Sequence, residues 1–445
     1  CPRHFRDSSL KIFTRHKKLV KQLFKTYRDA YAGLPREIWL LSLIMMINRS
    51  GTMVLLFFVL YLTDVFGFSN QTAGAIMSFS AVGGILGALA GGWASDRFGA
   101  IRAQIVFLGL VSFHFLLMLY AKSLTQITAA LFVMMFLNEA VRPGLHAACF
   151  QYSDPDNQKR SMGLLRLAIN LGMAIGPVVG GFLAEYELWN WLFILDALTC
   201  LVSAVLLFTV FGWRVQSPAL HPTKMGDEEE DHPSGRLDLQ PAAGTGSQSP
   251  WTDRRMLRFG VFFLMPLLVF VQLFSSFIKY LQDVYGFSES EIGWVNAINP
   301  ILIVAFEMII IRKLENQSTL KTVAAGTLLI CIGFGLLPFG STLWFCVLTV
   351  LIWSIGEILA FPLAAVYVAE LSTQANRGRY MSFITVLFSI SMVVGPVVGM
   401  SLYDYNRDLP WYLALLAGLI SFCGLWILAN GKQGIQRSPE PQTEE

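Results

Sequence analysis

The sequence predicts an all-α integral membrane protein with twelve transmembrane helices in two pseudo-symmetric halves of six. Of its 445 residues, 54% are hydrophobic and only 14% are charged, too little polar side chain to cover a water-soluble globule of this size. We count twelve apolar runs, each about 20 residues long, the length that crosses roughly 30 Å of hydrocarbon. Alternating strands of about ten residues are absent from the pattern, so we expect a helical bundle and not a barrel.

An internal repeat divides the chain into two homologous parts. Gly176–Gly180 (GPVVG) returns as Gly395–Gly399, an offset of 219 residues. At the same offset, Tyr61–Asp64 returns as Tyr280–Asp283. Self-similarity of this kind indicates a duplicated unit. We therefore expect the functional groups where two homologous membrane halves meet, the halves being residues 37–213 and 257–430.

Three polar segments flank or divide the predicted bundle. Residues 1–36 contain a basic amphipathic helix over Leu10–Tyr27, which either lies along an anionic membrane surface or is a solvated extension without function. Residues 214–256 predict a disordered linker, and residues 431–445 a polar tail. Because the Lys and Arg clusters fall on one side of the alternating topology, we expect both termini in the cytoplasm and the chain in the plasma membrane, the inner membrane of a bacterium.

Several polar residues fall inside the predicted spans, where an ionised group costs on the order of 3 kcal/mol at the centre of a helix. We expect them to line one cavity between the halves: Arg49, Glu139, Arg142, Arg166, Asn170 and Glu357. Glu139 and Arg142 share one helical face and can neutralise each other, so a purely structural ion pair is the alternative for these two. For Arg49 the alternative is a structural tether to a neighbouring helix.

Four further polar residues are assigned to structural or interfacial positions. His114 is expected to make a packing hydrogen bond. Asp196, near the outer end of its helix, is interpreted as an interfacial or packing residue. Lys279 and Glu307 lie toward helix ends, where long side chains can reach water.

A loop after the second predicted helix carries Gly92, Asp96, Arg97, Gly99 and Arg102. Its spacing resembles the cytoplasmic Gly-x-x-x-Asp-Arg-x-Gly pattern of the major facilitator superfamily, with the final basic run reduced to Arg102. We interpret the loop as a conformational latch, because Asp96 can accept hydrogen bonds at a helix N-terminus or pair with a basic group of a neighbouring helix. The resemblance implies the fold of that superfamily and secondary transport, and does not indicate a substrate.

Glycine and proline recur within the fifth and eleventh predicted helices. They predict helices that bend and pack closely, at Gly176, Pro177, Gly180, Gly395, Pro396 and Gly399. The series in the fifth helix resembles the antiporter motif of drug/proton exchangers. The eleventh helix repeats it without the second glycine, so the bend can also be plain architecture.

A narrower resemblance is to the proton-dependent oligopeptide transporter branch of the superfamily. The run Asn48–Met53 is similar to the first-helix Glu-x-x-Glu-Arg motif of that branch, Ile169–Gly172 to its fifth helix, and Gly356–Glu357 to its tenth. Met45 and Asn48 stand where the motif has two glutamates, so neither its proton site nor its peptide recognition carries over intact. Residue by residue, the resemblance transfers only to Arg49, Asn170 and Glu357.

The sequence favours a mechanism driven by an ion gradient. It shows no Walker-type phosphate loop, no nucleophile with a base partner and no metal-ligand spacing, so we expect no ATP hydrolysis, enzyme activity, cofactor or metal. Burial in low dielectric disfavours an ionised carboxylate, so Glu357 and Glu139 should bind protons. The expectation is proton-coupled alternating access, with the two halves rocking about the cavity.

Three functions remain open at this point. Export of a small amphipathic compound by proton antiport is the first, on the fifth-helix pattern. Proton-coupled import of a peptide-like or organic-anion solute is the second, on Arg49. A sensor or scaffold that binds solute without moving it is the third. The expected partners are a small-molecule substrate, protons and the lipid bilayer, with no nucleic acid, and we expect a monomer.

Overall fold

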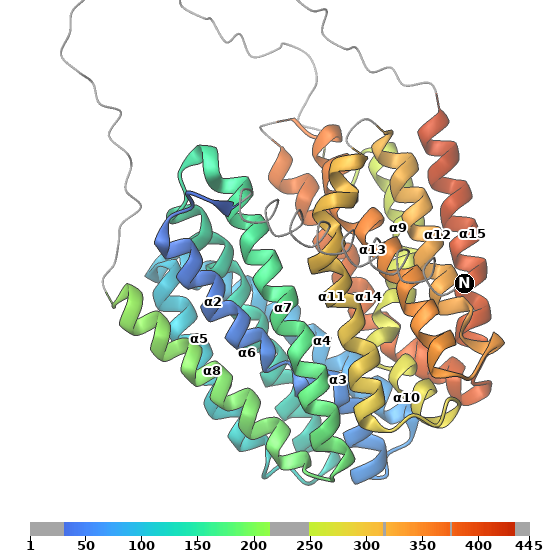
Figure 1. Cartoon of the computed structure of the whole chain (residues 1–445), viewed down its shortest axis with the longest axis horizontal. Coiled ribbons are helices and arrows are strands. Elements are labelled where there is room, and N and C mark those ends of the chain that lie inside the picture. The colour runs from blue at the N-terminus through green and yellow to red at the C-terminus, as the bar shows by residue number, and fades with distance from the viewer. Residues whose placement is uncertain (1–30, 214–248, 315–316, 374–375, 432–445) are drawn as a thin grey trace, which may run out of the picture.

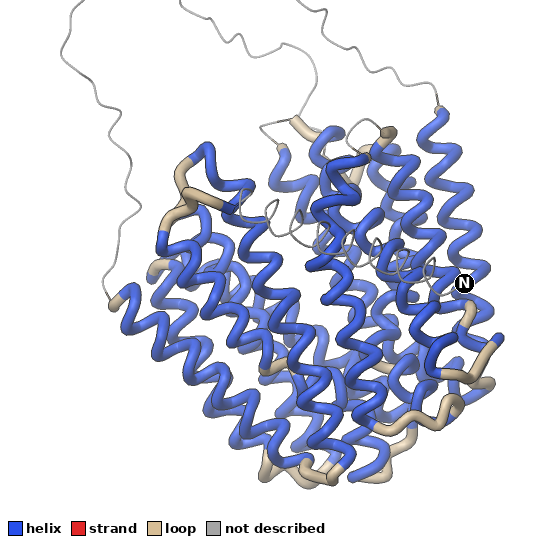
Figure 2. Tube along the Cα trace, in the orientation of Figure 1, coloured by secondary structure: helices blue, strands red, loops and turns tan. Residues whose placement is uncertain are grey.

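The computed structural model describes residues 31–213, 249–314, 317–373 and 376–431, and every regular element in these ranges is a helix (Figure 2). The predicted basic helix over residues 10–27, the acidic part of the linker and the tail beyond 431 lie outside the described residues. The first half comprises α2 (Arg36–Ser50), α3 (Met53–Leu60), η1 (Tyr61–Val65), α4 (Asn70–Phe98), α5 (Ala100–Met118), α6 (Leu124–Gln151), η2 (Pro155–Asn157), α7 (Gln158–Glu185) and α8 (Trp189–Phe211).

The second half repeats this plan and begins at Arg254, slightly before the predicted boundary at residue 257. It comprises α9 (Arg254–Phe270), η3 (Val271–Phe274), α10 (Ser276–Asp283), α11 (Glu289–Lys313), α12 (Thr319–Gly335), η4 (Leu337–Phe339), α13 (Leu343–Leu371), α14 (Arg377–Tyr405) and α15 (Leu409–Asn430).

The predicted fold class is confirmed. Within the described residues, 11 helical segments are long and apolar enough to span a membrane, with α2, α3 and η1 counted together as one 30-residue segment. The apolar helix α12 is shorter, at 17 residues, and takes the place of the remaining span. Each half therefore has six spans, and successive spans run in opposite directions.

The two halves lie side by side in Figure 1, the blue-to-green helices next to the yellow-to-red ones. The largest contacts between them are those of α4 with α14 and of α7 with α11, and α3 makes smaller contacts with η3 and α10. We call the end of the bundle that holds the α4–α5 turn at Gly99 the inner end, and the opposite end the outer end. The sequence predicts that the inner end faces the cytoplasm.

Glycines on α4 let it approach α6 backbone to backbone. Gly83, Gly87 and Gly91 are spaced four residues apart and face the carbonyl groups of Phe132, Phe136 and Ala140 on α6. A Cβ at any of these three glycines would collide with the facing backbone. Small residues of this kind allow the tight helix contacts on which packing in a membrane depends.

The first helix of each half is interrupted at matching positions. Gly51 and Thr52 separate α2 from α3, and η3 with Ser275 separates α9 from α10 within a few residues of the place that the 219-residue offset gives. The predicted bend glycines pack on these breaks. Gly176 and Gly180 of α7 face Ser50, Thr52, Met53 and Phe57, and Gly395 and Gly399 of α14 face Val271, Gln272 and Ser276.

The two prolines of the repeat make reciprocal contacts between the halves. The carbonyl of Pro396 in α14 lies against Gly74 of α4, and the carbonyl of Pro177 in α7 lies against Gly293 of α11. Both α7 and α14 run through their proline as one helix. Pseudo-symmetry therefore places the same contact twice at the interface of the halves.

Candidate functional site

A cavity of about 280 Å³ lies between the two halves. Its walls come from α4 and α6 of the first half and α14 of the second. Most of the lining is apolar, the ionisable side chains are on α6, and two hydroxyl side chains come from α14. The lining residues are Ala81, Gly84, Ile85, Ala88, Met135, Glu139, Arg142, Pro143, His146, Thr385, Phe388, Ser389 and Met392.

An ion pair faces this cavity from α6. The Arg142 guanidinium lies 3.0 Å from the Glu139 carboxylate, and their side chains are 51% and 24% exposed. His146, one turn further toward the inner end, is also exposed and lines the same cavity. Glu139, Arg142 and His146 thus follow the i, i+3, i+7 spacing of one helical face.

Arg49 lies in the last turn of α2, at the interruption of the first helix. Its Cβ packs against Gly172 of α7. Its guanidinium is within Coulombic range of Glu139 and Arg142. Three of the six predicted cavity residues therefore form one charged group on the first half.

The other three predicted residues belong to a second group, across the α7–α11 interface. Arg166 of α7 pairs with Glu307 of α11 at 2.9 Å, and the Asn170 side chain donates to the Arg166 carbonyl at 2.9 Å. Glu357 of α13 accepts a hydrogen bond from Asn299 of α11 at 2.8 Å. Glu357 is within Coulombic range of both members of the Arg166–Glu307 pair.

Glu307 was not predicted as part of the site. The sequence places it toward a helix end in contact with water, and this prediction is wrong, since its side chain is only 16% exposed. The acid instead compensates Arg166 of the other half. Whether Arg166 and Glu307 face each other depends on how α7 and α11 are rotated about their axes, and a single sequence does not reveal that rotation.

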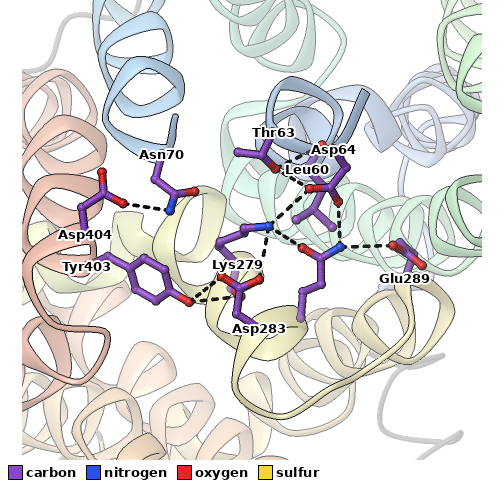
Figure 3. A network of polar contacts seen from close by, with 10 residues as sticks. Leu60, Thr63, Asp64, Asn70, Lys279, Asp283, Glu289, Tyr403 and Asp404 are labelled. Atoms are coloured by element: carbon purple, nitrogen blue, oxygen red, sulfur yellow. Dashed lines mark hydrogen bonds and ion pairs between the residues drawn. The ribbon is translucent and has the colours of Figure 1, made fainter. Parts of the chain in front are cut away.

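A polar network closes the outer end of the bundle (Figure 3). Lys279 lies 3.3 Å from Asp64 of the first half and 3.2 Å from Asp283. Gln282 also donates to Asp64, at 2.7 Å. Nearby, Asn70 of α4 donates to Asp404 of α14 at 2.9 Å. We call Asp64, Asn70, Lys279, Gln282, Asp283 and Asp404 the outer network.

The outer network also corrects a prediction about Lys279. Its side chain is 13% exposed and held between two carboxylates, and it does not extend to water as the sequence suggested. The signal for this cluster was present in the repeat. Asp64 and Asp283 occupy equivalent positions of the repeat, and both carboxylates pair with the ammonium group of Lys279.

Apolar side chains separate the cavity from the outer network. A void of only about 10 Å³ adjoins the cavity and shares Ala81, Met135 and Met392 with it. Its remaining walls lie nearer the outer ends of their helices and are Leu55, Met77, Ser80, Leu131, Val271, Phe274 and Pro396. Apolar side chains therefore close the cavity on its outer side, and the ion pairs of the outer network lie beyond these side chains.

At the inner end, the predicted latch residues form a one-residue turn between α4 and α5. Gly99 adopts a positive φ of 92°, which a glycine tolerates without strain. Arg97 lies over the Trp93 ring at 5.5 Å, and the Arg102 side chain donates to the Trp213 carbonyl at 2.6 Å. Asp96 is exposed and makes no hydrogen bond or ion pair within the part of the chain that the structure describes. Gly92 lies within α4, before the turn, and has open space where a Cβ would stand.

Two further polar residues in the spans have defined partners. His114 bonds to the Ala130 carbonyl at 2.7 Å, which confirms a packing role. Asp196 of α8 is 1% exposed, so the interfacial alternative is wrong and the packing alternative is confirmed.

Among the described residues, no group of three or more His, Cys, Asp and Glu side chains could hold a metal ion.

Known proteins provide an independent comparison. Among curated proteins, the chain is 25% identical over 387 residues to Multidrug resistance protein 2 of Bacillus subtilis (strain 168), covering 82% of this chain and 87% of that protein. It is 21% identical over 346 residues to Multidrug resistance protein MdtH of Aeromonas hydrophila, covering 76% and 81%.

Solved structures share the architecture. A mutant of the peptide transporter POT in complex with sulfate superposes with a TM-score of 0.69 at 17% identity, covering 90% of this chain and 96% of that one. The POT family transporter PepTSo gives a TM-score of 0.67 at 14% identity, covering 89% and 97%. Identities this low show a common fold alone.

The family assignment comes from a sequence model. The model described as the Major Facilitator Superfamily matches residues 38–396 and 259–444, which together span both halves. The matched residues include both copies of the repeat, the apolar spans and the latch turn. The chain is thus a multi-pass membrane protein and a transporter, and it belongs to the Major Facilitator Superfamily.

Proposed function

We propose that this protein is a proton-coupled secondary transporter that works by alternating access and exports a small amphipathic compound. The observation that carries the proposal is the cavity between the halves, which presents the Glu139–Arg142 ion pair among apolar side chains and is closed on its outer side. Such a chamber suits a solute with an apolar body and a polar group. Rocking of the halves about it would expose it to each side in turn.

Proton coupling is assigned to the buried carboxylates. Glu357 has an amide partner in Asn299 and, among the described residues, no basic residue bonded to it, so a proton would remove the cost of holding its charge in low dielectric. Glu139 shares its charge with Arg142 and Arg49 and is the second candidate. Protonation of Glu139 would free the Arg142 guanidinium to bind a substrate anion or another carboxylate.

Export is favoured over import by the lining of the cavity. Ile85, Phe388, Met392 and Met135 offer apolar and aromatic contact from both halves, and methionine adapts to varied shapes. The relatives from Bacillus subtilis and Aeromonas hydrophila named as multidrug resistance proteins support the same direction. We place the protein in the plasma membrane, the inner membrane of a bacterium, as a monomer with both termini in the cytoplasm.

Import of a peptide-like or organic-anion solute is the second candidate. It is supported by Arg49, whose guanidinium adds a positive charge to the group at the cavity. The fold shared with POT structures points to the same class of solute. Under this alternative the proton and the solute would move in the same direction.

Reconstituted proteoliposomes with an imposed pH gradient test both candidates. The two probes are ethidium, an amphipathic cation, and dialanine, a peptide-like solute. Antiport predicts that ethidium moves against the proton flow, and symport predicts that dialanine moves with it. Binding of a probe without gradient-driven movement or counterflow would instead assign the chain to the sensor class.

The variant Glu357→Gln tests the coupling site. We expect it to abolish gradient-driven transport while exchange of probe across the membrane partly persists, because a glutamine cannot carry the proton. Glu370→Gln on the same helix is the matched control, since Glu370 is exposed and bonds to Thr319 away from the cavity. Full gradient-driven transport by Glu357→Gln would overturn the assignment of the proton site.

A further inference from the structure

The break in the first helix has a partner on α8. Interrupting a helix leaves the N–H groups of the next turn without acceptors. The N–H groups of Met53 and Val54, at the start of α3, donate to the two carboxylate oxygens of Asp196 at 3.3 Å and 3.0 Å. One side chain from another helix thus satisfies both donors.

One face of α8 carries a stripe of polar side chains that contacts the interrupted first helix on both sides of the break. Asp196, Thr199, Cys200 and Ser203 follow the i, i+3, i+4, i+7 spacing of one helical face. Asn48 donates to the Cys200 sulfur at 3.5 Å, and Ser203 donates to the Ile44 carbonyl at 3.3 Å. The Thr199 side chain fills the space in which a Cβ at Gly51 would stand. The fit requires glycine at the break and polar groups opposite it.

The charges around the break suit the helix ends that they occupy. Arg49 lies in the last turn of α2, where the helix dipole is negative, and Asp196 lies at the first turn of α3, where it is positive. Asp196 is 1% exposed and forms no ion pair among the described residues. Its oxygens are used by two backbone donors, which suits a fixed acceptor and not a carrier that takes up and releases protons.

We propose that Asp196 is a positioning residue, whose carboxylate caps α3, holds the first helix open at Gly51 and thereby fixes the backbone that carries Arg49 within Coulombic range of Glu139. Without the cap, the break would relax, and the backbone that carries Arg49 would be held to α8 from the α2 side only, through Asn48 and Ile44. The role of Arg49 in binding rests on the proposed function, whereas the cap itself does not.

Amide hydrogen exchange tests the cap without any substrate. Loss of a hydrogen bond to a charged group is worth about 1.5–3 kcal/mol. Asp196→Asn should therefore raise exchange at Met53 and Val54 at least about tenfold, and Asp196→Ala should raise it further. Ser203→Ala is the matched control, because it removes a bond of the same stripe but leaves both α3 donors capped. Unchanged exchange at Met53 and Val54 in Asp196→Asn would overturn the proposal.

A double-variant cycle tests whether Asp196 acts through Arg49. Asp196→Asn should shift the KM for ethidium or dialanine in the same direction as Arg49→Gln, with kcat less affected, and the combined variant should match Arg49→Gln alone. Loss of gradient-driven transport in Asp196→Asn with KM unchanged would identify a proton carrier and contradict the positioning role. If the wild-type protein moves neither probe, the proposed function fails, and hydrogen exchange still decides the cap.

Discussion

The guanidinium of Arg166 lies 2.9 Å from the carboxylate of Glu307, and this pair joins α7 of the first half to α11 of the second. It is an ion pair between the halves on the inner side of the Gly293–Pro177 contact. In the proposed alternating access the two halves move relative to each other, so we expect this pair to break and reform during the cycle.

Removing Arg166 should cost more stability than removing Glu307. The Glu307 side chain is 16% exposed and that of Arg166 43%, so Arg166→Gln leaves a mostly buried acid without its partner. An uncompensated buried polar group costs about 1–3 kcal/mol. Glu307→Gln leaves an arginine that can still reach water. Thermal unfolding in detergent should show the lower Tm for Arg166→Gln, and the reverse order would contradict this account.

Lys279→Ala should open the outer end. The substitution leaves Asp64 and Asp283 close together without the cation between them, and like charges repel. Spin labels at Tyr186 and Tyr405, exposed residues of opposite halves at the outer end, should then report longer distances. Lys279→Arg keeps the charge and serves as the control. Unchanged distances in Lys279→Ala would show that hydrocarbon packing alone closes this end.

The glycines that face the two prolines should not tolerate alanine. In Gly74→Ala and Gly293→Ala the new Cβ meets the carbonyl of Pro396 or Pro177 and pushes two helices of opposite halves apart. Each variant should lower Tm and increase outer-end distances. Gly109→Ala on α5 is the control, because its Cβ would meet no atom within 4 Å. In a helix interior, alanine is favoured over glycine by about 1 kcal/mol, so the control should be neutral or stabilising.

Asp96→Asn should leave the stability of this conformation unchanged. Asp96 is exposed and makes no hydrogen bond or ion pair within the described ranges, so nothing is lost when its charge is removed. If the latch forms when the inner end closes, the variant should nevertheless slow transport of ethidium or dialanine. Equal Tm with a reduced rate is the expected result, and a lower Tm would mean that Asp96 already has a partner.

Composition and repeat were sufficient to predict the architecture. The scarcity of charge required a bilayer, and the copies of the GPVVG run located the two halves. Arg49, Glu139 and Arg142 could be grouped because burying each alone is costly. The pairing of Arg166 with Glu307 could not be predicted, because a bundle that is apolar on most sides gives no signal for helix rotation.

The break at Gly51 was also not visible in the sequence, since apolar residues continue on both sides of it. Without the break, Asp196 had no evident role. The outer network was partly accessible, because the repeated Asp64 and Asp283 mark equivalent positions. The repeat did not indicate the lysine that lies between these two acids, because the first half has no copy of it.

Gly74 meets the carbonyl of Pro396, and Gly293 meets that of Pro177. An interface in which one patch contacts another and receives the same contact in return is isologous, the form found in two-fold dimers. A single six-helix unit with this glycine and this proline would present a self-complementary surface to its own copy. Each half of the protein therefore contributes one glycine and one proline to the interface, and the two halves meet through two copies of a single contact.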